Sequence, residues 1–200
     1  MLANWEPVNY SICVIMPPRG LWAPFVEIKK NHMNPRIKRP PYPHITLCSP
    51  FVNPKNYPEV KIKIREALKS IEPFEINFAN FELFKNYSST TLYLAPQSDS
   101  EISQLYKLLI ATLPSSIVKE QNNFEPHIGV GYFKGSKNNA DIFQKKYQSN
   151  WTPLKFNVQE IYFLRRRHQE SPWEVEEIVS LGQKELPPLF KIGDTTDSLK

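Results

Sequence analysis

The sequence contains little cysteine and little glycine, with 2 cysteines and 6 glycines in 200 residues. Cys13 and Cys48 each lie in an apolar, strand-like stretch, and neither belongs to a CxxC pair or to a Cys/His spacing typical of zinc sites. Both are therefore expected to be buried free thiols. The glycines form no GxGxxG or GxxxxGK[ST] motif, so nothing indicates the phosphate loop of a dinucleotide-binding or P-loop protein.

Long apolar runs are also missing from the N-terminal part of the chain. The apolar stretch at residues 12–16 is too short to cross a bilayer. It follows Glu6 and no basic segment leads it, unlike the apolar region of a signal peptide. We therefore expect a protein of the cytoplasm, or alternatively of the nucleus, with no membrane partner.

The composition that remains is that of a folded domain. Hydrophobic residues make up 40% of the chain and aromatic residues 12%, which is enough for a core. We expect a single domain over residues 1–182 with two small lobes, followed by a flexible, proline- and charge-rich tail over residues 183–200. The formal net charge of +5 fits a phosphate-bearing partner, although basic proteins without an anionic ligand are more common.

A short phrase occurs twice in the chain. The first copy, Pro43–Leu47, reads PHITL, and the second, Pro126–Val130, reads PHIGV. On an extended strand, successive side chains point to opposite faces. Each copy can therefore bury its isoleucine and present its histidine on the other face. His44 and His127 are far apart in sequence, so only the fold can bring them together.

The apolar periodicity predicts an alternation of helices and strands. Helical spacing is found near residues 24–32, 57–71, 102–113 and 138–147. Strand-like stretches surround the two histidines and occur near residues 9–16, 74–84, 90–94, 156–164 and 173–181. Without a nucleotide-binding βαβ motif, this order favours an α+β fold with largely antiparallel sheets. The repeated histidine strand indicates two similar lobes facing each other.

The two motifs resemble those of a known family. PPYPHITLCSPF and FEPHIGVGYF are similar to the paired His-x-Thr/Ser motifs of the 2H phosphoesterase superfamily, which includes RNA 2′,3′-cyclic phosphodiesterases, also called 2′-5′ RNA ligase-like proteins. The resemblance covers residues 9–182. It implies a bilobal fold in which two pseudo-symmetric antiparallel sheets line a central cleft and helices cover the outer faces.

The resemblance also implies roles for the motif residues. His44 and His127 match the catalytic pair, and Thr46 matches the first phosphate-binding hydroxyl. Gly129 stands where the family has the second Thr or Ser, so this chain lacks that hydroxyl. The glycine is either a lost donor or a place where the backbone approaches the phosphate closely, and the sequence leaves both readings open.

The chemistry expected of such a pair needs neither a metal nor a cofactor. Histidine can act as acid and base near neutral pH. The family implies opening of a 2′,3′-cyclic phosphate of RNA ends or nucleotides to a 2′-phosphomonoester by a monomeric enzyme. Alternatives are another 2H-type activity, such as trimming of oligonucleotides or 2′-5′ linkages, and an RNA- or nucleotide-binding module whose catalysis faded with Gly129.

Other candidate residues have ordinary explanations beside functional ones. A lone histidine on a strand is usually structural, and only the repeated motif changes that judgement for the pair. Tyr42 can stack a base or simply pack. Arg165 opens a run of three arginines that can meet a phosphate or lie in solvent. The same alternatives apply to the basic residues before the first motif, Arg36, Lys38 and Arg39. His32 and His168 are expected at the surface.

Overall fold

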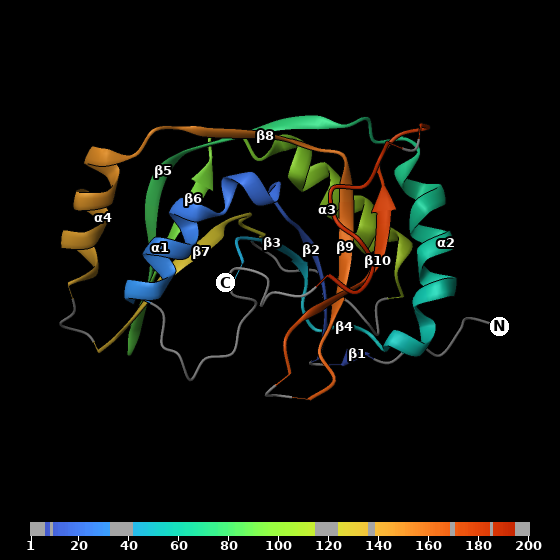
Figure 1. Cartoon of the computed structure of the whole chain (residues 1–200), viewed down its shortest axis with the longest axis horizontal. Helices are drawn as coiled ribbons and strands as arrows, with labels where there is room; N and C mark the ends of the chain where they lie inside the picture. Colours follow the sequence, from blue (N-terminus) through green and yellow to red (C-terminus); the bar gives the residue numbers. More distant parts are fainter. Residues whose placement is uncertain are drawn as a thin grey trace.

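An antiparallel sheet runs through the molecule and carries both histidine motifs (Figure 1). The computed structural model describes residues 7–8, 10–32, 42–114, 124–135, 139–168, 171–184 and 186–194. In this part of the chain the sheet has eight strands in the order β10-β9-β2-β3-β7-β6-β5-β8. Their bounds are β2 Ser11–Ile15, β3 Ile45–Cys48, β5 Phe74–Asn86, β6 Ser89–Pro96, β7 Ile128–Lys134, β8 Leu154–Val158, β9 Glu160–Arg165 and β10 Glu174–Ser180. A separate pair joins β1 (Pro7–Val8) to β4 (Phe51–Val52).

Helices lie toward both ends of this sheet. The helical segments are α1 Ala23–His32, α2 Tyr57–Leu68, α3 Ser100–Thr112, α4 Ala140–Asn150, and the short 3₁₀ helices η1 Arg19–Leu21 and η2 Pro54–Asn56. Helix α1 packs on β7 and α4 on β5 and β6, whereas α2 packs on β10 and α3. In Figure 1, α4 and α2 therefore stand at opposite ends of the longest axis. None of the described helices combines the length and the apolar character that a membrane-crossing helix needs.

The sheet consists of two halves of four strands, each with its histidine strand at the inner edge. One half is β10-β9-β2-β3 and the other is β7-β6-β5-β8. They meet where Ile45 of β3 pairs with Ile128 of β7, and both isoleucines are fully buried. The predicted α+β class and the two similar antiparallel halves are confirmed. The prediction of two sheets is corrected in one respect, because the halves join edge to edge through this pair.

The two faces of the sheet bury different apolar clusters. Ile15, Ile45 and Ile128 belong to the larger cluster, whereas Val14 belongs to a smaller cluster with Trp22. This division follows from the pleat, since neighbouring residues of a strand point to opposite faces. The alternation predicted around each histidine is therefore what anchors its strand to the core.

Both cysteines are buried free thiols, as expected from their apolar surroundings. Cys13 on β2 is paired with Cys48 on β3, and both belong to the larger cluster. Burial raises the pKa of the Cys13 thiol well above its usual value, and raises that of Cys48 to about 12. Neither thiol is therefore expected to form a reactive thiolate near neutral pH.

The strand predicted over residues 156–164 is two strands in different halves of the sheet. Strand β8 pairs with β5, and β9 pairs with β2 and β10. The chain passes from one half to the other at Gln159, whose carbonyl accepts a hydrogen bond from the amide of Leu181. No glycine or proline marks this point, so there is no turn signal. The only sign of the break is that the apolar alternation up to Val158 stops at the polar pair Gln159-Glu160 before the apolar run that begins at Ile161.

Part of the segment predicted to be a flexible tail is packed against the sheet. Phe190 is 2% exposed, stacks on Trp22 and meets Tyr162 edge to face. The amide of Leu189 donates to Glu160. The packed region therefore extends beyond residue 182, and residues 195–200 lie outside the described residues.

Candidate active site

The two histidines precede neighbouring strands. His44 stands directly before β3 and His127 directly before β7, and these strands are antiparallel with Ile45 opposite Ile128. Residues opposite each other in such a pair have Cα atoms about 4.5–5.5 Å apart. Because each histidine is next to its isoleucine, both imidazoles leave the sheet on the face opposite the buried isoleucine side chains.

The same register brings the remaining motif residues to that face. Continued by one residue on either side of Ile45, it sets His44 opposite Gly129 and Thr46 opposite His127. Thr46 also pairs with Val14 and Gly129 with Tyr93. All four motif residues are half-buried. The phrase repeated in the sequence thus becomes a four-residue patch across the joint between the two halves.

Each imidazole is held by the same kind of hydrogen bond. His44 Nδ1 lies 3.0 Å from the carbonyl oxygen of Tyr42, and His127 Nδ1 lies 2.7 Å from that of Glu125. A carbonyl oxygen can only accept, so Nδ1 carries the proton in both rings. Nε2 is then the nitrogen whose protonation can change, and the two rings are prepared in the same tautomer.

A buried lysine supports the first of these hydrogen bonds. Lys29 on α1 is 8% exposed, and its Nζ donates to the same carbonyl oxygen of Tyr42 at 2.9 Å. This oxygen therefore receives a charged donor and the imidazole of His44 together. Lys29 was not singled out by the sequence reasoning. Its only signal is its position four residues after Phe25, on the apolar side of the helix.

Aromatic rings border the second histidine. The imidazole of His127 meets Phe84 and Tyr93 edge to face, with ring centroids 4.9 and 5.2 Å away. Phe84 and Tyr93 are themselves stacked, with centroids 3.9 Å apart, and the Tyr93 hydroxyl donates to Glu82. Burial and this hydrogen bond raise the pKa of the Tyr93 hydroxyl, which therefore stays protonated at neutral pH.

Gly129 has open space where a side chain would stand. A Cβ built on this residue meets no other atom within 4 Å, and its φ is outside the left-handed region. Gly131 differs, because a Cβ there would lie 3.1 Å from Phe133 and 3.2 Å from His32. The family's hydroxyl residue would therefore fit at position 129 without strain.

Comparison with known proteins identifies the family to which this chain belongs. Residues 17–170, which include both motifs, match the model of the 2′-5′ RNA ligase superfamily. The chain belongs to this superfamily. The resemblance drawn from the two motifs is thus confirmed.

Individual relatives of this superfamily member agree with that assignment. A Halalkalibacterium halodurans protein named "Putative phosphoesterase BH1439" is 28% identical over 148 residues, which are 72% of this chain and 81% of the relative. E. coli LigT, in a crystal structure with 3′-AMP, superposes with a TM-score of 0.61 at 15% identity, covering 89% of this chain and 100% of LigT. Kluyveromyces marxianus Usb1, in a structure with uridine monophosphate, gives a TM-score of 0.52 at 10% identity, covering 88% and 99%. The two solved structures show the shared fold.

Tyr42 does not stand where a base could stack on it. The side chain of Tyr42 is 2% exposed, and its ring packs against that of Trp22 with the ring centroids 5.2 Å apart. Its buried hydroxyl has no hydrogen-bond partner among the described residues. The prediction that Tyr42 binds substrate by stacking is therefore wrong. Its contribution to the site is the backbone carbonyl that holds His44.

Arg165 is not brought to the histidines. It pairs with Ser11 at one end of β2, whereas Ile45 pairs with Ile15 at the other end. The four steps along β2 from Ser11 to Ile15 span about 13 Å. Arg165 forms an ion pair with Glu176 instead. Of the basic residues considered before the first motif, Arg36, Lys38 and Arg39 lie outside the described residues.

His32 is not the surface residue that was predicted. Its Nε2 lies 2.6 Å from the hydroxyl of Tyr147, and its ring is 4.2 Å from that of Phe143. Burial and the nearby charge of Lys146 lower its pKa. His32 therefore ties α1 to α4. His168 is exposed, as predicted.

The side chains of the described residues form no candidate metal centre. Within the described ranges, no group of three or more His, Cys, Asp or Glu side chains could hold a metal ion. The chemistry that the patch offers is therefore that of two imidazoles, a threonine hydroxyl and backbone N–H groups.

Proposed function

We propose that this protein is a phosphoesterase that opens 2′,3′-cyclic phosphates of RNA ends or nucleotides to 2′-phosphomonoesters, with His44 and His127 as general acid and base. The observation that carries the proposal is the pair of imidazoles directly before two adjacent, paired strands. Each donates through Nδ1 to a backbone carbonyl, so Nε2 is the nitrogen that can take up or release a proton. Such a pair can serve both sides of one phosphorus atom without a metal.

The reaction needs one proton to be taken and one to be given. One imidazole accepts a proton from water as the water oxygen bonds to phosphorus, and the bond from phosphorus to the sugar 3′-oxygen breaks. The other imidazolium protonates that oxygen, which leaves a 3′-hydroxyl and a 2′-phosphate. The next turnover requires the two imidazoles to exchange a proton with solvent. Positioned acids and bases of this kind each contribute about 10²- to 10⁴-fold in rate.

Negative charge on the phosphate oxygens needs donors as the water attacks. We assign this role to the hydroxyl of Thr46 on the first strand and to backbone N–H groups near Gly129 on the second. Thr46 shares a face with His44, as Gly129 does with His127. The buried ammonium of Lys29 holds the carbonyl that orients His44.

Relatives of the same fold support a nucleotide or RNA substrate. LigT has been solved with 3′-AMP and Usb1 with uridine monophosphate. A nucleotide end is therefore the ligand class that we infer for this chain. We also propose that the protein acts as a monomer in the cytoplasm or nucleus.

The test is turnover of nucleoside 2′,3′-cyclic phosphates and of RNA ending in a cyclic phosphate, with the 2′- and 3′-phosphate products resolved. His44→Ala and His127→Ala should each lower kcat by about 10²- to 10⁴-fold while circular dichroism and Tm show an intact fold. The pH–rate profile should be bell-shaped and should report the pair of histidines together. Near-normal rates in either variant, or a 3′-phosphate as the main product, would refute the proposal.

A second candidate is a binding module of the same fold with weakened catalysis. The specific observation in its favour is Gly129, which supplies no hydroxyl where the family has Thr or Ser. This alternative would be established if the protein bound a 2′,3′-cyclic nucleotide at equilibrium but did not turn it over. Turnover should then be absent across the whole pH range in which the bell-shaped profile predicts activity.

A further inference from the structure

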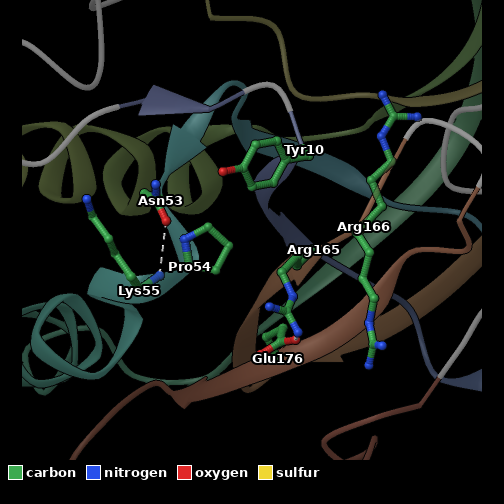
Figure 2. Close-up of a pocket in the computed structure, with 8 residues that line it drawn as sticks. Tyr10, Asn53, Pro54, Lys55, Arg165, Arg166 and Glu176 are labelled. Atoms are coloured by element: carbon green, nitrogen blue, oxygen red, sulfur yellow. Dashed lines mark hydrogen bonds and ion pairs between the residues drawn. The ribbon is translucent and has the colours of Figure 1, made fainter.

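A basic pocket lies away from the histidines. It has a volume of about 480 Å³ and is lined by Tyr10, Asn53, Pro54, Lys55, Arg165, Arg166, Arg167 and Glu176. Figure 2 shows Asn53, Pro54 and Lys55, at and before η2, on one side. Arg165, the last residue of β9, and Arg166, directly after it, lie on the other side, with Tyr10 between the two groups. The lining therefore brings four cationic side chains and one carboxylate together from separate parts of the chain.

The one carboxylate of the lining is already engaged. Strand β10 has a bulge between Val175 and Glu177, so Glu176 falls outside the ladder, and it forms an ion pair with Arg165. The Nε of Arg165 is buried and has no hydrogen-bond partner among the described residues. An unsatisfied buried donor of this kind costs free energy, and a ligand that brought a hydrogen-bond acceptor to this guanidinium would reduce that cost.

The other cations of the pocket are held in place to different degrees. The guanidinium of Arg166 lies over the ring of Trp173, 5.0 Å from its centroid, and its amide donates to the carbonyl of Tyr10. The charged groups of Lys55 and Arg167 form no ion pair with any residue in the described ranges. The pocket thus keeps positive charge available beside a partly fixed guanidinium, as suits an anion with several oxygens.

The position of the pocket limits what that anion can be. Ser11, opposite Arg165, and Ile15, opposite Ile45, stand at the two ends of β2, about 13 Å apart along the strand. A nucleoside 2′,3′-cyclic phosphate has a single phosphate, which the histidines would hold. An RNA strand carries one further phosphate for every nucleotide before its end.

We propose that this pocket binds a backbone phosphate of the RNA strand whose 2′,3′-cyclic end reacts at the histidines. The inference rests on the proposed function for the identity of the strand, and it assigns Lys55, Arg165, Arg166 and Arg167 to binding the polymer. Its consequence is a preference for RNA ends over free cyclic nucleotides. This preference resides outside the four-residue patch of His44, Thr46, His127 and Gly129.

The test compares a pocket variant with a matched control. The pocket variant is Lys55→Gln/Arg167→Gln, and the control is Lys107→Gln/Lys145→Gln, which removes the same charge from exposed positions on α3 and α4. Both are assayed on a nucleoside 2′,3′-cyclic phosphate and on single-stranded RNA with a cyclic end. Binding of a fluorescent RNA with a 3′-phosphate end is measured by anisotropy over a series of NaCl concentrations.

The pocket variant is expected to bind the RNA about ten-fold more weakly than the control. Its salt slope should be smaller by about 0.7 for each RNA phosphate that the variant no longer neutralises. Its kcat/KM on the mononucleotide should equal that of the parent. If glutamine causes unfolding, detected by circular dichroism, the single variant Arg167→Glu replaces it with the same expectations.

Two results would overturn the inference: RNA affinity and salt slope that match the control, or an equal loss on the mononucleotide and on RNA. The proposed function fails separately, because it predicts turnover by the parent protein. If the parent protein shows no turnover but its RNA affinity still depends on the pocket, the RNA-binding site is supported and the proposed phosphoesterase activity is refuted.

Discussion

Replacing Gly129 by serine is expected to make the protein faster. Position 129 is on the same face as His127, as Thr46 is with His44. A Cβ added there meets no atom within 4 Å, and the backbone is not in the left-handed region. Serine therefore adds a hydroxyl beside the proposed phosphate position without displacing a neighbour, and we expect it to act as the donor that the family's Thr or Ser supplies.

The size of the gain follows from what such a donor contributes. Removing one donor from a preformed oxyanion site typically costs about 10²- to 10³-fold in kcat. Recovering a well-aligned donor in Gly129→Ser should raise kcat on a nucleoside 2′,3′-cyclic phosphate by up to this factor. A hydroxyl that reaches the phosphate only in some rotamers should raise kcat by a smaller factor, about ten-fold. This corresponds to lowering the barrier by about 1.36 kcal/mol.

The matched control is Gly129→Ala, which adds the same Cβ without a hydroxyl. Its rate should stay near that of the parent, since nothing stands where the methyl group would be. Initial rates at saturating substrate, with Tm measured for every variant, compare the three proteins. A folded serine variant no faster than the alanine variant would refute the reasoning. Two variants that are both slower than the parent would show that the substrate needs the backbone itself to come close.

Three further predictions concern the surroundings of the pair. Lys29→Met should lower kcat by about ten- to a hundred-fold with little change in KM, because the carbonyl that orients His44 loses its charged donor; an unchanged kcat would contradict this role. Tyr42→Phe should leave turnover and Tm nearly unchanged, since the buried hydroxyl has no partner among the described residues; a large loss of binding would restore Tyr42 as a ligand. Activity should survive excess EDTA, because the donors of the patch are two imidazoles and a hydroxyl without a carboxylate or thiolate cluster; loss of activity with rescue by a divalent ion would refute the acid–base scheme.

The sequence was sufficient to predict the fold class and the strands that begin directly after the two histidines. Both results depend on local alternation. Ile45 and Ile128 are apolar and fully buried in the core, and the pleat therefore turns the histidine beside each of them to the other face. The repeated phrase carried the long-range information as well, since equivalent strands in two similar halves are natural neighbours. The fold class and the histidine strands were therefore predictable, because each depends on a pattern within a few consecutive residues.

The remaining features depend on tertiary contacts that no local pattern encodes. The division of β8 from β9 at Gln159 is set by which strands each segment pairs with, not by a turn signal. Tyr42 resembles an exposed loop aromatic in sequence, and its burial comes from packing within the smaller cluster, where its ring contacts Trp22. Lys29 and Phe84 come from a helix and a strand far from either motif, so their contact with the site appears only in the folded chain.

The two halves repeat the hydrogen bond that orients each imidazole, but they support it with different residues. Lys29 donates to the carbonyl that holds His44, whereas Phe84 and Tyr93 border the ring of His127. A pH–rate profile alone cannot divide its two limbs between coupled histidines. A change at a supporting residue can, because it acts on one ring and leaves the other in its own surroundings. The limb that moves in Lys29→Met would therefore belong to His44, and the limb that moves in Phe84→Leu would belong to His127.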